Sequence, residues 1–360
     1  MTAHATIVPR PGIMDIAPYV GGSSHIDGAN RVIKLSANEN PFGPSASAVD
    51  AYRDHAEHLG LYPEAQEEVA ATIAQVHGLE PGRIVLGAGS DEIISLLCQA
   101  YAGPGDEVLY SEHGFLMYKL SSMAAGATPV TAPERNLTAD VDQLIAAMND
   151  RTRLVFVANP NNPTGTMIGK AELTRLADAL PPQAMLVIDA AYAEYLKPAE
   201  DDGAKELVAT RDNVLMTRTF SKIYGLAALR LGWAYVPEHV AAVYHRVRGP
   251  FNVTAPALAA GVAAMRDQAY VDRCRVTNEV WRDWLTREIL AAGLGVVPSK
   301  GNFVLVQAGD RVADLDAHLK SRGLIARRVD AYGLAGYLRI SVGDEEACRL
   351  VADAITTFGA

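Results

Sequence analysis

Residues 153–189 read RLVFVANPNNPTGTMIGKAELTRLADALPPQAMLVID, a segment in which one complete strand–helix–strand unit can be recognised. Its two ends, Arg153–Val157 and Met185–Asp189, are short apolar runs without polar alternation. Such runs are typical of parallel strands that are buried on both faces. Between them, Lys170–Leu180 predicts a helix, which a Pro-Pro pair closes. The segment therefore predicts a parallel strand pair joined by a crossover helix.

The same alternation continues on both sides of this segment. A helix is expected at Asp91–Ala100, and a second helix ends between Ser121 and Gly126. Further strands are expected at Arg83–Gly87, Asp106–Tyr110, Val214–Met216 and Leu231–Val236. Strands that alternate with helices imply an α/β fold with a mostly parallel central sheet flanked by helices.

The pattern changes near Gly249-Pro250. A long helical stretch follows, from about Ala255 to Ala292, and it carries Trp281 and Trp284 on one face. Strands are then expected at Asn302–Val306 and Tyr337–Ser341, flanked by helices, which is typical of a smaller α+β domain. We therefore expect three regions: 1–48 as an N-terminal arm and part of the small domain, with one strand at Val32–Leu35; 49–248 as the large domain; and 249–360 as the small C-terminal domain.

Composition limits the classes of function. The chain has 360 residues, of which 49% are hydrophobic, and its net charge is −10. A nucleic-acid backbone requires a basic face, so nucleic acid is not an expected partner. Three widely separated cysteines exclude a disulfide framework and favour reduced thiols in the cytoplasm. No apolar run is long enough for a membrane span, and residues 1–12 do not resemble a signal peptide. No metal site is predicted.

The first candidate for chemistry is Gly87–Glu92, which follows a strand and opens a helix. Glycines let the backbone approach a ligand, and a helix N-terminus offers free N–H groups to a phosphate. The same residues are also compatible with a simple helix start that Ser90 or Asp91 caps. A dinucleotide site is disfavoured, because Glu92 occupies the position of the third glycine in that fingerprint.

Two further candidates follow buried strands. Asn159–Gly165 comes after the first strand of the opening segment, and Asp189 ends the second strand, three residues before Tyr192. The same residue types also occur where there is no ligand, because Asn, Pro and Gly form turns and Asp caps helices. However, open α/β sheets bind ligands at the carboxyl ends of their strands, and a carboxylate is costly to bury without a partner.

The last candidate is Thr219–Lys222, with Arg230 eight residues after the lysine. Lys222 is surrounded by small, apolar and hydroxyl residues, and a less hydrated lysine has a lowered pKa and can act as an amine nucleophile. Together, the four candidates provide what pyridoxal 5′-phosphate needs. Lysine binds its aldehyde, aspartate holds its ring nitrogen protonated, Asn and Tyr donate to its phenolic oxygen, and a helix end with hydroxyls and an Arg holds its phosphate.

The order Gly-Ser-Asp, Asn-Pro-Thr-Gly, Asp-x-x-Tyr and Ser-Lys with a later Arg resembles the fold-type I, class II pyridoxal-phosphate-dependent aminotransferases. Four segments are similar to the histidinol-phosphate aminotransferase family in particular: Ile16–Gly22, Leu35–Pro44, Leu61–Glu64 and Leu338–Gly343. The resemblance covers essentially the whole chain. It implies transamination between L-histidinol phosphate and 2-oxoglutarate, which gives imidazole-acetol phosphate and L-glutamate in histidine biosynthesis, with the cofactor in the large domain.

The resemblance also implies roles for single residues. Lys222 would form the Schiff base and shuttle the proton, Asp189 would pair with the ring nitrogen, and Asn162 and Tyr192 would bond the phenolic oxygen. Phe115 would stack on the ring, although many relatives have Pro-Thr-Tyr where this chain has His-Gly-Phe. The phosphate would be held by Gly89, Ser90, Asp91, Thr219, Ser221 and Arg230.

For the substrate, the resemblance assigns the carboxylate to Arg339 and the phosphate or distal carboxylate to Arg327, with Arg328 as an alternative. Tyr19 and Asn40 would line the pocket, with Asn302 nearby. Tyr62 would reach the cofactor phosphate of a partner subunit, which implies a homodimer.

Other functions use the same residues. An aromatic amino acid aminotransferase or a phosphothreonine decarboxylase on the same scaffold would keep the cofactor set. A cofactor-holding regulator usually carries a DNA-binding module, for which this chain has neither the length nor a basic segment. A dinucleotide-dependent dehydrogenase is disfavoured, because its reaction would give Lys222 no chemical role.

Overall fold

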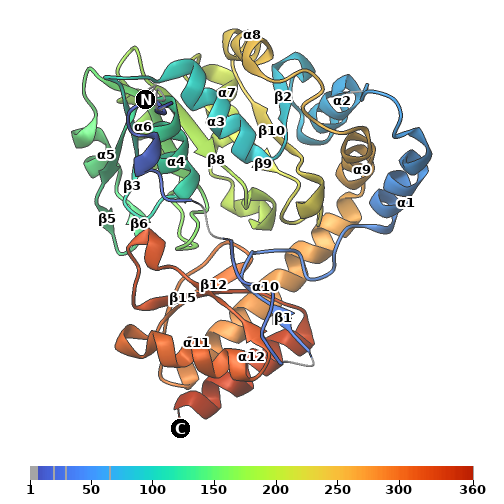
Figure 1. The fold of residues 1–360 in the computed structure, drawn as a ribbon, viewed down its shortest axis with the longest axis vertical. Helices are drawn as coiled ribbons and strands as arrows, with labels where there is room; N and C mark the ends of the chain where they lie inside the picture. The colour runs from blue at the N-terminus through green and yellow to red at the C-terminus, as the bar shows by residue number, and fades with distance from the viewer. Residues whose placement is uncertain (1–6, 19–20, 29–30, 65, 360) are drawn as a thin grey trace, which may run out of the picture.

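The computed structural model describes residues 7–18, 21–28, 31–64 and 66–359. Its upper body in Figure 1 is built on one seven-stranded sheet. The strands lie in the order β2 (Ile84–Gly87), β10 (Gly232–Tyr235), β9 (Val214–Thr219), β8 (Met185–Asp189), β7 (Thr152–Ala158), β3 (Glu107–Ser111) and β4 (Thr128–Ala132). β10 runs antiparallel to both of its neighbours, whereas the pairs from β9 to β4 are parallel. The prediction of a mostly parallel central sheet is confirmed.

The central strands are apolar throughout because both of their faces are covered. Along β7, Leu154 and Phe156 pack into one hydrophobic cluster while Val155 and Val157 pack into another, and each is at most 1% exposed. The first cluster contains residues of α3 (Ser90–Tyr101), α4 (Leu116–Ala125) and α8 (Glu238–Val247). The second contains residues of α1 (Ala46–Asp54), α2 (Gln66–His77), α5 (Val141–Ala147), α6 (Lys170–Asp178), α7 (Ala204–Thr210) and α9 (Ala255–Arg266).

The lower body in Figure 1 is smaller and has its own core. Its antiparallel sheet has the order β11 (Gly295–Val297), β12 (Phe303–Gln307), β15 (Tyr337–Ser341) and β14 (Arg327–Arg328). The helices α11 (Val312–Ser321) and α12 (Glu345–Gly359) pack on it. The early strand β1 (Ile33–Lys34) pairs in parallel with β13 (Leu324–Ile325), so residues near the N-terminus join the C-terminal part of the chain. A short hairpin, β5 (Glu134–Arg135) and β6 (Thr138–Ala139), completes the strands.

The long helical stretch from Ala255 to Ala292 is two helices, α9 and α10 (Gln268–Ala291), and not one. The break falls at Asp267, whose Oδ1 accepts the backbone N–H of Tyr270 at 3.0 Å and so caps α10. α9 packs on α1 and α2, beside the large sheet. α10 then runs down into the lower body (Figure 1). The domain limit near residue 249 stays a prediction.

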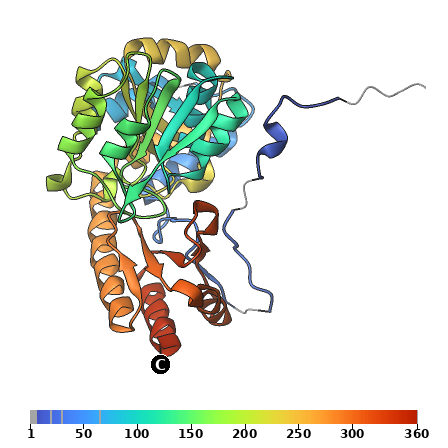
Figure 2. The same cartoon turned by 90° about the vertical axis from the view of Figure 1, so that its left-hand side faces the viewer.

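The N-terminal residues 7–18 form an arm beside the upper body, as Figure 2 shows. Ile7 is 97% exposed and Met14 is 81% exposed, so the arm has no apolar packing of its own at these positions. In the part of the chain that the structure describes, no helix combines the length and the apolar character that a membrane span requires.

Candidate active site

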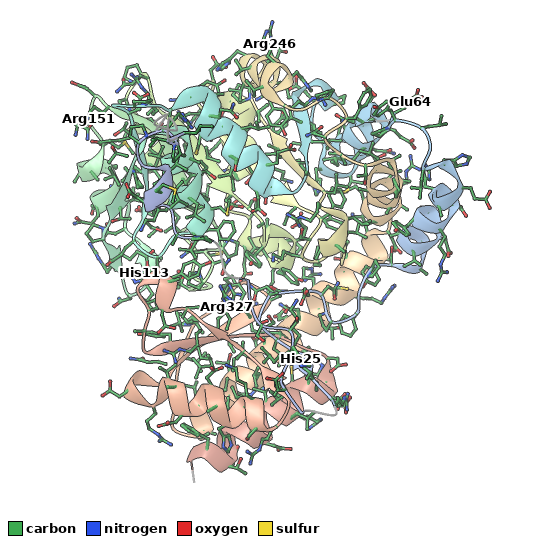
Figure 3. All side chains as sticks on the ribbon, in the orientation of Figure 1. His25, Glu64, His113, Arg151, Arg246 and Arg327 are labelled. Carbon is green, nitrogen blue, oxygen red and sulfur yellow. The ribbon has the colours of Figure 1, made fainter. Side chains whose placement is uncertain are left out.

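A cleft of about 190 Å³ opens where the parallel strands of the large sheet end. The carboxyl ends of parallel strands meet at one edge of a sheet, and β2, β7, β8 and β9 deliver their following residues there. The small sheet closes the cleft from the other side, and Figure 3 shows Arg327 at this junction between the two bodies. The predicted site residues that line it are Ser90, Asp91, Phe115, Asn162, Asp189, Tyr192, Thr219, Ser221, Lys222, Arg230, Arg327 and Arg339.

One end of the cleft is suited to an anion. The helix α3 begins at Ser90, directly after Gly89, whose φ of 84° is in the left-handed region. The Arg230 guanidinium lies against this helix start, 3.2 Å from Ser221 Oγ and 3.1 Å from Asp91 Oδ2. A Cβ atom at position 89 would lie 2.3 Å from Arg230 Nη2, so glycine is required for this close approach. Free N–H groups, hydroxyls and a guanidinium together form a seat for a phosphate.

Asp189 lines the same cleft and is only 4% exposed. Its Oδ2 accepts a hydrogen bond from the Tyr118 hydroxyl at 2.7 Å, and its Oδ1 accepts one from Thr217 at 3.3 Å. Burial is the main cause that raises the pKa of Asp189 to about 6. Both hydroxyl donors are neutral, so a protonated ring nitrogen of a ligand would provide the positive charge that this carboxylate needs.

Lys222 and Tyr192 lie side by side in the cleft. Lys222 Nζ donates to the backbone oxygen of Ala37 at 3.2 Å and lies 5.7 Å from the centre of the Tyr192 ring. Tyr192 is buried, and its burial raises the pKa of the phenol to about 12, so the hydroxyl keeps its proton at neutral pH. Lys222 and Asp189 thus line one cleft from the ends of neighbouring strands, as the motifs predict.

The small sheet contributes two arginines. Arg339 on β15 is 6% exposed, and its guanidinium donates to Asn162 Oδ1 and, at 2.8 Å, to the backbone oxygen of Ser36. Arg327 on β14 is the register partner of Arg339 and also lines the cleft. The next residue, Arg328, instead donates to Asp330 at 2.6 Å and is not part of the lining. The geometry therefore favours Arg327 over Arg328 as the second substrate arginine.

Several predicted residues are not brought into this cleft. Asn40 lies outside the lining and donates to the backbone oxygen of Ile223 at 2.6 Å, and Asn302 donates to that of Asn38 at 2.9 Å. Gly89 is not itself part of the lining but immediately precedes the lining residue Ser90 in the sequence. Tyr19 falls outside the described residues. The roles predicted for Asn40, Asn302 and Tyr19 stay predictions.

Tyr62 also lies away from the cleft of its own chain. It is 77% exposed and stacks on Phe251 with ring centres 4.5 Å apart. Both residues line a second groove beside α9. Figure 3 places Glu64, two residues further along, on the opposite side of the upper body from Arg327. Within one chain, Tyr62 is therefore not part of the cleft.

Several residues that contribute to the site escaped the sequence interpretation, among them Tyr118, Ser36 and Asn38. Tyr118 lies one helical turn after Phe115, a spacing that could have suggested a shared face. Ser36 and Asn38 lie within the segment Leu35–Pro44 and line the cleft. Their side chains could have been considered, because this segment carries one of the family motifs.

The described residues fit pyridoxal 5′-phosphate. The cleft contains a buried carboxylate held by two neutral hydroxyls, a lysine on the neighbouring strand end, and a helix N-terminus with a guanidinium. These three groups match the ring nitrogen, the aldehyde and the phosphate of that cofactor.

Comparisons with known proteins agree with this geometry. A family model described as aminotransferase class I and II matches residues 30–355. The chain is 56% identical over 357 residues to a histidinol-phosphate aminotransferase of Dinoroseobacter shibae, covering 98% of each chain. It is 52% identical over 363 residues to one of Paramagnetospirillum magneticum, covering 99% of each. The structure is also similar to that of histidinol-phosphate aminotransferase from Sinorhizobium meliloti in complex with pyridoxal 5′-phosphate, with a TM-score of 0.90, 27% identity, and coverage of 99% of this chain and 98% of that one.

Proposed function

The chain belongs to the aminotransferase class I and II family, and on that premise we propose that it transfers the amino group of L-histidinol phosphate to 2-oxoglutarate, with pyridoxal 5′-phosphate as cofactor. The observation that carries the proposal is the placement of Lys222, Asp189 and the α3 N-terminus around one cleft. The names of the relatives and the two arginines on the small sheet support the choice of substrates.

The cofactor would be held at three points. Lys222 would hold its aldehyde, Asp189 its ring nitrogen, and Ser90, Ser221 and Arg230 its phosphate. Phe115 lines the cleft and would cover a face of the ring. When bound, the protonated ring supplies an electron sink for negative charge at the α-carbon of the substrate. Asp189 maintains that property, because an ionised carboxylate in a buried site favours protonation of the nitrogen beside it.

Lys222 is the residue that moves a proton. Its amine donates to the Ala37 carbonyl at 3.2 Å and lies 5.7 Å from the centre of the Tyr192 ring, within the cleft. As a neutral amine it would accept the proton from the α-carbon of the substrate and would deliver it to carbon C4′ of the cofactor. Tyr192 and Asn162 would bind the phenolic oxygen of the cofactor and hold its ring in register with the amine.

The two substrates carry different anions, and two arginines of the small sheet are available to bind them. Arg339 would bind the α-carboxylate of glutamate, and Arg327 would bind the phosphate of histidinol phosphate or the distal carboxylate of glutamate. The lining includes Lys222, Arg230, Arg327 and Arg339 but only Asp91 and Asp189 as acids. This excess of positive charge favours doubly negative substrates although the whole chain carries −10.

We also propose that the active unit is a homodimer in which Tyr62 reaches the cofactor phosphate of the partner subunit. Exposed apolar side chains gather around the second groove, with Leu61 74%, Tyr62 77% and Phe251 49% exposed. A cluster of this kind is typical of an interaction surface. A cytoplasmic location is part of the proposal, and the three buried, unpaired cysteines support it.

The decisive experiment combines absorption spectroscopy with a substrate panel. Purified protein is expected to carry a visible absorption band, and histidinol phosphate is expected to convert the cofactor to its amine form in a single half-reaction. Replacement of Lys222 by Ala should abolish the covalent attachment and nearly all turnover. Full activity in that variant would refute the proposal.

The panel also separates the alternatives. Higher kcat/KM with phenylalanine or tyrosine than with histidinol phosphate would identify an aromatic aminotransferase. Release of CO₂ from phosphothreonine would identify a decarboxylase on the same scaffold.

A further inference from the structure

Asn38 lies between the small sheet and Tyr192, and both ends of its side-chain amide are hydrogen-bonded. It is 1% exposed, and its Nδ2 donates to the Tyr192 hydroxyl at 2.9 Å. Ser341 on β15 accepts the backbone N–H of Asn38 at 2.8 Å and donates its own hydroxyl proton to Asn38 Oδ1 at 3.1 Å. Asn38 therefore connects a strand of the small sheet with a phenol in the cleft.

These contacts give each hydrogen bond of the Asn38 side chain a consistent direction. Because the Ser341 hydroxyl donates to Oδ1, the carbonyl end of the Asn38 amide faces β15 and its NH₂ end faces Tyr192. Turning the amide over would place its NH₂ group against the Ser341 hydroxyl and take away the oxygen that accepts the serine proton. The amide thus presents only donors to Tyr192. The phenol oxygen accepts, and its own proton must point elsewhere.

The backbone around Asn38 is also held in place. Its φ of 56° lies in the left-handed region, which Asn tolerates better than most residues. Asn302 donates to its carbonyl oxygen at 2.9 Å. Ser341 stands two positions after Arg339 on β15, so one face of this strand carries both the substrate arginine and the anchor of Asn38.

We propose that Asn38 is a positioning residue that forces the Tyr192 hydroxyl to donate its proton into the cleft, toward the phenolic oxygen of the cofactor. The inference rests on the proposed function, which supplies that acceptor. Four charged side chains also lie near Tyr192, in addition to the neutral amide of Asn38. They are Arg339, Asp189, Asp91 and Lys222. The hydrogen bond to the phenol oxygen comes from Asn38, whose Nδ2 is the donor.

The test is Asn38→Asp in the cofactor-loaded protein. A carboxylate accepts and cannot donate, so it should capture the Tyr192 proton and turn it away from the cleft. The phenolic oxygen of the cofactor then loses a donor that favours its ionised form. The pH midpoint of the visible absorption band should rise by about one unit or more, and cofactor affinity should fall about tenfold. Tyr192→Phe should produce a shift of similar size.

A double-variant cycle separates this effect from the added charge. If Asn38 acts through Tyr192, Asn38→Asp should cause no further shift in a Tyr192→Phe background. An equal further shift there would overturn the proposal, because a bare charge acts without the phenol. Asn136→Asp is the matched control, since Asn136 is exposed, has a φ of 52° and lies outside the cleft lining. It should leave the midpoint unchanged, whereas a shift equal to that of Asn38→Asp would overturn the proposal.

Ser341→Ala provides a second route should Asn38→Asp fail to fold. It leaves Asn38 in place but removes the group that orients its amide, so a smaller shift in the same direction is expected. A folded Asn38→Asp or Ser341→Ala protein with the wild-type midpoint would overturn the inference alone. A wild-type protein without any cofactor band would refute the proposed function, and this inference with it.

Discussion

At the scale of single residues, the cleft contains a charge that the protein alone does not balance. Asp189 receives hydroxyl donors from Tyr118 and Thr217, yet burial still raises its pKa to about 6. Its ordinary value is near 3.8. Between these two pH values, the folded cofactor-free protein holds a proton that the unfolded chain releases. The free energy of unfolding must therefore fall as the pH rises through this window.

Asp189→Asn is expected to stabilise the cofactor-free protein. Above pH 6 the ionised carboxylate costs about 3 kcal/mol of folding free energy, which Asn removes. Below about pH 4 the two proteins should be equally stable. Urea unfolding of both proteins across pH 4–8 measures this difference. A wild-type protein as stable as the variant at pH 8 would contradict the assignment of the buried charge.

Arg327→Ala should act on the charged substrate. Loss of a hydrogen-bonded charge pair is expected to raise KM for histidinol phosphate about 10- to 100-fold, with little change for phenylalanine, which lacks the phosphate. Arg328→Ala is the matched control, because Arg328 contacts Asp330 and lies outside the lining. Steady-state kinetics with both donors decide the matter. An equal rise in KM for histidinol phosphate and for phenylalanine would show that Arg327 does not bind the phosphate.

The place of a single residue in the candidate site could be predicted where a short sequence motif contains that residue. Lys222 and Asp189 stand within short motifs at strand ends, and the structure brings both to one cleft. Tyr118 and Asn38 could not be assigned partners in this way. Their hydrogen-bond partners lie 71 and 154 residues away along the chain, and no local pattern reveals such a contact.

At the scale of elements, the start of α3 shows how a helix end becomes a binding site. Gly89 precedes the first helical residue, and the Arg230 side chain occupies the space where a Cβ atom would lie. The glycine is therefore required by a side chain from another element as well as by its own backbone conformation.

Gly89→Ala is expected to weaken both folding and cofactor binding. The backbone of Gly89, with φ 84° and ψ 164°, costs a residue with a side chain about 1–3 kcal/mol, and the new methyl group also displaces Arg230. Gly78→Ala isolates the backbone cost, because Gly78 has a φ of 68° and nothing lies within 4 Å of the position that a Cβ atom would take there. Both variants should lose stability in urea, Gly89→Ala the more, and only Gly89→Ala should lose cofactor affinity in a titration. Equal affinities would show that Arg230 does not hold the phosphate.

Element types were predictable from apolar runs, but one boundary was not. The helical pattern runs on from Ala255 to Ala292, whereas the structure divides it at Asp267. Aspartate inside such a pattern is compatible with a solvent-exposed position or a cap. In the structure Asp267 caps α10, and α9 packs on α1 and α2, which is a tertiary arrangement that the local pattern does not contain.

At the scale of the whole molecule, the exposed face around Tyr62 leads to a test by subunit mixing. If Tyr62 serves the partner's site, a heterodimer of a Lys222→Ala chain and a Tyr62→Ala chain contains one site with both residues intact. Exchange of subunits between these two variants should therefore produce more activity than either variant alone. If Tyr62 acted within its own chain, mixing would restore nothing.

The two bodies of the molecule share a single long helix. Near its start, Val271 and Cys274 of α10 pack with the large sheet, and further on, Leu285 and Ile289 pack with the small one. A helix turns by about 100° per residue. One residue inserted between Cys274 and Leu285 would therefore rotate the small-sheet body relative to the large-sheet body by about that angle. The lining of the cleft includes no residue of α10, so such a change would shift the small sheet relative to the large one without replacing any side chain that lines the cleft.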